Sequence, residues 1–147
     1  MSGYPPADDG LHPPASAVRQ AVAGALAEDL LPLGDLSAGL VPAHVRARPQ
    51  VVARRAGVVA GSRCAAEAFA QVDPDLEVRW ACREGEGVEP GQVLAEVEGP
   101  LRAILTAERT ALNFLGHLSG VATLTRRFVD AATAVDPSVR ILDTRKT

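Results

Sequence analysis

The chain has 147 residues, of which 47% are hydrophobic and 22% charged, with a formal net charge of −3. This length is too short for a complete (β/α)₈ barrel, which needs about 250 residues, and the composition is too apolar for a disordered chain. The acidic balance excludes the overall basic footprint of a nucleic-acid-binding protein, and an aromatic content of 3% excludes a platform for stacking bases. We therefore expect no nucleic acid as a partner.

Cysteine and histidine spacing gives no metal motif. The two cysteines, Cys64 and Cys82, are far apart, and His12, His44 and His117 fall in no zinc-binding pattern. The first residues lack a signal peptide, and no uncharged apolar stretch of 18 residues occurs. We expect a chain with no membrane partner, located in the cytoplasm, with both thiols free.

The elements are predicted in chain order from periodicity and from turn residues. Residues 1–14 are rich in proline and are expected to be a disordered tail, followed by a helix from Ser16 to just before Pro32. The next predicted elements are a turn at 34–37, extended runs at 51–53 and 58–60, a helix at 64–72, a strand at 76–80, a tight turn at 85–91 and a strand from 93 that Gly99-Pro100 breaks.

The last third predicts a long helical region that Glu108-Arg109-Thr110 opens and that Ser119-Gly120 softly interrupts. A buried strand at 139–142 is expected to follow it and to lead directly into Asp143-Thr144-Arg145-Lys146-Thr147. In an α/β layout the next element would cover such a strand, so the chain has the pattern of an unfinished domain. The exposed strand predicts dimers or aggregates rather than a monomer, and deletion of the residues after Ala134 is expected to improve solubility.

Several patterns that could carry chemistry are better explained structurally. Residues 85–98 resemble the hairpin of lipoyl and biotinyl carrier domains, but the only lysine of the chain, Lys146, lies outside it. A structural β-hairpin is therefore favoured. Glu96 and Glu98 share one face of a predicted strand, and neither they nor His117 have the partners of an acid/base pair or a triad.

Basic residues are the stronger candidates, because residues 101–147 carry seven Arg or Lys against four Asp or Glu. Arg109 is predicted near a helix start, where the helix dipole disfavours a cation. Arg145 and Lys146 follow a predicted strand, at the end where α/β sheets bind ligands. Together they suit an anionic substrate. An exposed basic terminus with no ligand explains the same two residues equally well.

The run from Glu108 to Leu115, its continuation Leu118-Ser119-Gly120-Val121-Ala122-Thr123, and the final Asp143-Thr144-Arg145-Lys146-Thr147 resemble the signature of the quinolinate phosphoribosyltransferase family, also called nicotinate-nucleotide pyrophosphorylase (carboxylating). Four earlier segments resemble the N-terminal domain of that family: Glu28-Asp29, Gly34-Asp35-Leu36-Ser37, residues 57–61 and Gly91-Gln92-Val93-Leu94. The resemblance covers nearly everything after the tail.

The resemblance implies an α/β fold with an N-terminal α+β sandwich domain at 15–117 and, at 118–147, the first elements of an incomplete α/β barrel. It implies transfer of phosphoribose from phosphoribosyl pyrophosphate to quinolinate with decarboxylation, giving nicotinate mononucleotide, pyrophosphate and CO₂ with Mg²⁺. It also implies a homodimer in which Arg109 reaches the quinolinate carboxylates of the neighbouring subunit. Arg145, Lys146 and, more weakly, Thr144 would bind substrate oxygens.

The family pattern continues beyond this strand, with further basic residues and with the acidic residues that hold the metal, so we expect no metal ligands and no catalytic residue in this chain. As it stands, the chain is expected to be an inactive fragment of the NAD-biosynthesis enzyme. Two alternatives stay open: a related pyrophosphorylase-like protein with another substrate, and a non-catalytic interaction or dimerisation module that docks on another subunit.

Overall fold

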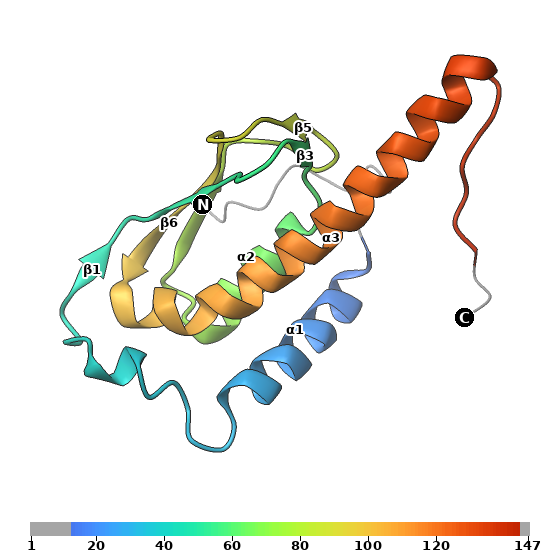
Figure 1. Cartoon of the computed structure of the whole chain (residues 1–147). Helices are drawn as coiled ribbons and strands as arrows, with labels where there is room; N and C mark the ends of the chain where they lie inside the picture. Colours follow the sequence, from blue (N-terminus) through green and yellow to red (C-terminus); the bar gives the residue numbers. More distant parts are fainter. Residues whose placement is uncertain (1–12, 145–147) are drawn as a thin grey trace.

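The computed structural model describes residues 13–144, which form a four-stranded and a two-stranded antiparallel sheet packed against helices (Figure 1). The mixed helix and strand composition expected from the sequence is confirmed. The elements, in chain order, are α1 (Ala15–Leu30), the short 3₁₀ helix η1 (Ala38–Leu40), β1 (Arg46–Ala47), β2 (Gln50–Val52), β3 (Gly57–Val58), α2 (Ser62–Val72), β4 (Glu77–Trp80), β5 (Gly87–Val88), β6 (Val93–Pro100) and α3 (Leu101–Val135).

Strand β6 is the centre of the sheet and pairs antiparallel with β1, β2 and β4. The prediction that Gly99-Pro100 breaks this strand is wrong, because these residues pair with Ala47 and Arg46 of β1. Proline is tolerated there because it occupies the last position of the strand. Strand β5 lies inside the predicted tight turn at 85–91 and pairs with β3. Residues 85–98 therefore do not form a hairpin of β5 with β6.

The apolar side chains of α1, α2, α3 and β6 form one core. Helix α1 contributes Val18, Val22 and Leu26 at helical spacing, as the sequence predicts, and α2 contributes Ala65, Ala68 and Phe69. Helix α3 packs against α1, α2, β3 and β6, and in Figure 1 it passes in front of α2. The outer side of the sheet is charged: Arg48 and Arg79 each form ion pairs with both Glu96 and Glu98.

Helix α2 begins at a sharp turn that packs against α3 and accepts no change at Gly61 without a clash, and the Glu84 carboxylate binds its first amides. Gly61 has a positive φ of 94° and lies against α3, so that an added Cβ would lie 2.8 Å from Leu118 Cδ1 and 3.1 Å from the Phe114 carbonyl oxygen. The Glu84 carboxylate accepts hydrogen bonds from the Gly61 and Ser62 amides at 2.6 and 3.1 Å, and also from the Ser62 hydroxyl. This satisfies amides that a helix start leaves unpaired.

Helix α3 is continuous over 35 residues, from Leu101 to Val135. The predicted start at Glu108 is therefore wrong by two turns, because β6 runs directly into the helix. The predicted interruption at Ser119-Gly120 is also wrong. One glycine costs a helix only about 1 kcal/mol, and packing against α2 and β3 outweighs that cost. The helix passes through position 117, where sequence analysis ends the first domain.

Hydroxyl groups of α3 bind the strand β3 and the residues after it. The Thr123 hydroxyl accepts a hydrogen bond from the Val58 amide at 2.9 Å, and the Ser119 hydroxyl both accepts from the Ala60 amide and donates to the Ala60 carbonyl. We call these contacts the α3–β3 seam. Among residues 13–144, β3 pairs only with the two-residue β5, so the hydrogen bonds of the α3–β3 seam help to hold β3 in place.

The buried strand predicted at 139–142 is wrong. The described residues after α3 form no strand, and Val139, Ile141 and Leu142 are 42%, 45% and 78% exposed. An alternating apolar run forms a strand only where a neighbouring strand accepts its hydrogen bonds, and none pairs with it here. Thr144 is exposed, whereas Arg145 and Lys146 lie outside the described residues, as does the predicted tail up to residue 12.

Within residues 13–144, no helix combines the length and the apolar character that crossing a membrane requires. The C-terminal part of α3 instead projects beyond the rest of the molecule and carries exposed apolar side chains, including Val121, Leu124 and Phe128 at 53%, 53% and 60% exposure (Figure 1). These three are spaced by three and four residues, so they share one face of the helix and form an apolar surface rather than scattered single residues.

This surface predicts self-association of the 147-residue chain. We expect dimers or larger species by light scattering, and a shift toward monomer when Leu124→Gln and Phe128→Gln are combined, because two large apolar side chains leave the surface. Arg126→Gln, a polar change on the same segment, is the control and should leave the distribution unchanged. A stable monomer of the unsubstituted chain would contradict this expectation.

Candidate functional site

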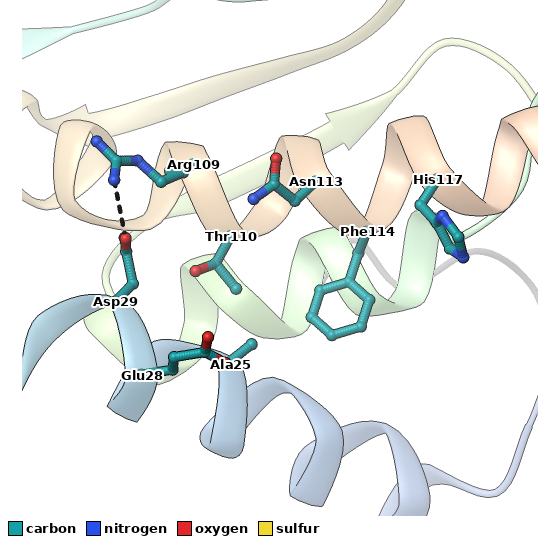
Figure 2. Close-up of a pocket in the computed structure, with 8 residues that line it drawn as sticks. All are labelled: Ala25, Glu28, Asp29, Arg109, Thr110, Asn113, Phe114 and His117. Carbon is teal, nitrogen blue, oxygen red and sulfur yellow. Dashed lines mark hydrogen bonds and ion pairs between the residues drawn. The ribbon is translucent and has the colours of Figure 1, made fainter.

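A cavity of about 410 Å³ lies between α1 and α3 (Figure 2). Its lining combines charged, polar and aromatic side chains from the two helices: Ala25, Glu28, Asp29, Arg109, Thr110, Asn113, Phe114 and His117. A concave site with a few convergent polar groups is the usual form of a small-molecule site. We call it the α1–α3 pocket.

Helix periodicity explains which side chains α3 presents to the pocket. Arg109, Asn113 and His117 are spaced by four residues, so they follow one another along one face of the helix. All three are exposed, whereas a different face buries Ala107, Ala111 and Leu115 in the core. A guanidinium, a carboxamide and an imidazole therefore form a row of hydrogen-bonding groups at the surface.

Arg109 is anchored at one nitrogen. Its Nη1 donates a hydrogen bond to Asp29 Oδ1 at 3.1 Å, near the C-terminal end of α1 (Figure 2). The Arg109 side chain is 74% exposed and that of Asp29 is 23% exposed. Among the described residues, Nη2 and Nε of Arg109 have no other hydrogen-bond partner. The arginine can therefore still offer N–H groups to a carboxylate or phosphate.

Arg109 does not occupy the position in its helix that the sequence predicts. It lies in the third turn of α3, not near the helix start, so the helix dipole places no cost on it. Sequence reasoning missed Asp29, Asn113 and His117 as lining residues. The four-residue spacing within the predicted helix could have grouped the last two with Arg109, whereas the approach of Asp29 depends on how α1 packs.

The structure does not bring the remaining predicted site residues to this pocket. Thr144 is exposed and does not line it, and Arg145 and Lys146 lie outside the described residues. No group of three or more acidic, histidine or cysteine side chains that could hold a metal occurs in residues 13–144. The described residues therefore do not fit a Mg²⁺ site, and we derive no step through the ion.

Both cysteines are buried and unpaired. Burial and nearby carboxylates raise the pKa of the Cys64 and Cys82 thiols, with burial as the larger cause. A thiol whose pKa is raised stays protonated at neutral pH and is a poor nucleophile. Neither cysteine is a candidate for covalent catalysis.

A larger groove of about 1020 Å³ lies on the other side of α3, along residues 49–59. Apolar side chains make up much of its wall, among them Val51, Leu112 and Leu115, and three arginines, Arg54, Arg55 and Arg127, also line it. Such a wall has the character of a packing surface. The α1–α3 pocket is smaller, and it gathers a guanidinium, two carboxylates, a carboxamide and an imidazole in a small space.

Comparison with known proteins identifies the family. Residues 35–119 match the family described as quinolinate phosphoribosyl transferase, N-terminal domain. The chain is 43% identical over 124 residues to the chloroplastic nicotinate-nucleotide pyrophosphorylase (carboxylating) of Oryza sativa, covering 84% of this chain and 32% of the rice protein. A tobacco quinolinate phosphoribosyltransferase (decarboxylating), from Nicotiana tabacum, is 39% identical over the same length, covering 84% of this chain and 34% of the tobacco protein.

Solved structures agree in fold. NadC from Streptococcus pyogenes superposes with a TM-score of 0.85 at 32% identity, covering 92% of this chain and 48% of its own. The nicotinate-nucleotide pyrophosphorylase from Francisella tularensis superposes with a TM-score of 0.81 at 31% identity, covering 88% and 45%. The chain spans about a third of the length of these curated plant relatives. With more than half of its residues matched by the N-terminal domain description, the chain belongs to the quinolinate phosphoribosyltransferase family.

Proposed function

We propose that the protein containing this chain transfers phosphoribose from phosphoribosyl pyrophosphate to quinolinate, releasing pyrophosphate and CO₂ and forming nicotinate mononucleotide. The pyridine nitrogen forms a bond to the ribose carbon as the bond from that carbon to pyrophosphate breaks. The carboxylate next to the nitrogen then leaves as CO₂, and a proton takes its place. The cationic ring stabilises the electron pair left on carbon, so this step requires no acid/base side chain.

The observation that carries the proposal is the exposed Arg109 of the α1–α3 pocket, held by Asp29 at one nitrogen and open at the others. Quinolinate is a dianion, and a planar guanidinium is well suited to one of its carboxylates. The family membership of the surrounding residues supports this substrate over other dianions.

The charge of the pocket supports a site shared between subunits. Its lining residues include one arginine against the two carboxylates of Glu28 and Asp29, which is too little positive charge for a dianion and a phosphorylated co-substrate. In our proposal, Arg145 and Lys146 of a second copy in a homodimer supply the remaining positive charge. Thr144 of that copy also binds substrate oxygens. Mg²⁺ remains part of the proposal by family resemblance alone, and a cytoplasmic location remains part of it by the sequence features alone.

The proposal is tested with an extended chain, in which residues 1–147 are followed by the part of the Streptococcus pyogenes relative that this chain does not cover. We expect it to form nicotinate mononucleotide from quinolinate and phosphoribosyl pyrophosphate, detected by chromatography, and to reject nicotinate, which carries one carboxylate. We expect the 147-residue chain alone to form none. An extended chain that folds as a dimer but gives no product would contradict the proposal and favour the interaction module.

A further inference from the structure

We propose that Asp29 is a positioning residue for Arg109: its carboxylate holds the guanidinium by Nη1 so that the remaining N–H groups face a substrate carboxylate. The inference deepens the proposed function and depends on it for the identity of the ligand. The orientation of Arg109 itself can be measured without any ligand.

The first argument is the position of Asp29 in its own helix. Asp29 and Glu28 lie in the last turn of α1, which contains no basic residue. A carboxylate there faces the negative end of the helix dipole, so it destabilises the helix locally. Intrinsic helix stability therefore does not explain an acidic residue at this position, and the contact with Arg109 gives it a role.

The second argument is the exposure of the pair. The Arg109 side chain is 74% exposed, and a solvent-exposed ion pair adds little to folding stability. The side chain of Asp29 is 23% exposed and is the less exposed member. An exposed arginine has many rotamers, and the contact with Asp29 favours those that place Nη1 at Oδ1 before a ligand arrives. Such preorganisation lowers the entropy cost of binding.

The third argument is the geometry of the contact. Only Nη1 is used, at 3.1 Å from Asp29 Oδ1 (Figure 2). The edge formed by Nη2 and Nε stays open, and this edge can bind a carboxylate through two parallel hydrogen bonds. Asp29 thus occupies the part of the guanidinium that a bidentate ligand does not need, which distinguishes it from a competitor of the substrate.

The first experiment uses the 147-residue chain and NMR relaxation of the Arg109 side-chain Nε–H group. We expect Asp29→Ala to lower the order parameter of this group markedly. Glu77→Ala is the matched control, because it removes the 2.6 Å contact of another exposed ion pair, with Arg79, whose residues do not line the pocket. It should leave Arg109 unchanged. Equal order of Arg109 with and without Asp29 would overturn the inference, whatever the function of the protein.

The second experiment measures kinetics in the extended chain. We expect Asp29→Ala and the isosteric Asp29→Asn to raise KM for quinolinate about 10-fold and to change KM for phosphoribosyl pyrophosphate less than about 2-fold. In an Arg109→Ala background, the same changes should have no further effect, because the group being positioned is absent. Melting temperatures identify variants that fail to fold.

Equal changes in both KM values, additive effects in the Arg109→Ala background, or a lower KM for quinolinate would each overturn the inference while leaving the proposed function intact. Absence of product from the unsubstituted extended chain would instead overturn the proposed function. In that case quinolinate would no longer be assigned as the ligand of Arg109. The NMR result would still decide whether Asp29 orients Arg109.

Discussion

Arg109→Ala in the extended chain is expected to lower kcat/KM for quinolinate by about 30- to 1,000-fold, which corresponds to about 2–4 kcal/mol. The physical reason is the loss of a charge-assisted bidentate contact, in a site that a second subunit would partly cover in the proposed homodimer. Arg109→Lys should recover little of this loss, because an ammonium group cannot reproduce the planar fork. Steady-state kinetics with each substrate varied in turn provide the measurement.

The same variant tests whether the site is shared between subunits. Mixing Arg109→Ala chains with Lys146→Ala chains should form heterodimers in which one of the two sites keeps both residues. Activity should then rise well above the residual activity of either variant alone. If mass spectrometry confirms mixed dimers and no activity returns, Arg109 does not act across an interface.

Gly61→Ala is expected to destabilise the fold by about 2–5 kcal/mol. An alanine at a φ of 94° is strained, and its Cβ would meet Leu118 Cδ1 at 2.8 Å and the Phe114 carbonyl oxygen at 3.1 Å. The backbone oxygen cannot move without disturbing α3, so α2 must shift away from α3. Urea unfolding followed by circular dichroism measures the change.

Gly24→Ala is the matched control for this variant. Gly24 lies on the exposed face of α1, and an added Cβ meets nothing within 4 Å. Alanine is the better helix former, so this change should stabilise the chain by about 0.5–1 kcal/mol. Similar effects of the two substitutions would show that the contact of Gly61 with α3 is not important for stability.

Local patterns predicted most of the fold. The spacing of Val18, Val22 and Leu26 correctly predicted helix α1, and the alternation around Val78 correctly predicted strand β4. Both patterns are local, because each depends only on which side of the element is buried. The wrong predictions have a common cause, which is that contacts with other elements do not appear in a local pattern. Pro100 closes a strand and Gly120 sits within a helix because neighbouring elements stabilise these positions. Residues 139–142 have the pattern of a strand but no strand to pair with.

The candidate site was predictable only in part. Arg109 could be chosen from the sequence because the residues around it resemble a family motif. The pairing of Arg109 with Asp29 could not be predicted, since the two are 80 residues apart along the chain and their contact depends on the packing of α1 beside α3. The sequence also does not predict that the pocket lacks an excess of positive charge, because this depends on the packing that places Glu28 and Asp29 beside Arg109.

Because α3 is one continuous helix, the side chains that contact α1 and those that contact the β3 region keep a fixed rotation about the helix axis relative to each other. At about 1.5 Å per residue, the helix is about 50 Å long, and each residue turns it by about 100°. Arg109 and Asn113 face α1, while Thr123 and Ser119, further along, bind β3 and the residues after it. Insertion or loss of one residue between these pairs would preserve both sets of side chains and yet turn one set away from its partner. Point substitutions should therefore be tolerated far better than length changes between residues 113 and 119.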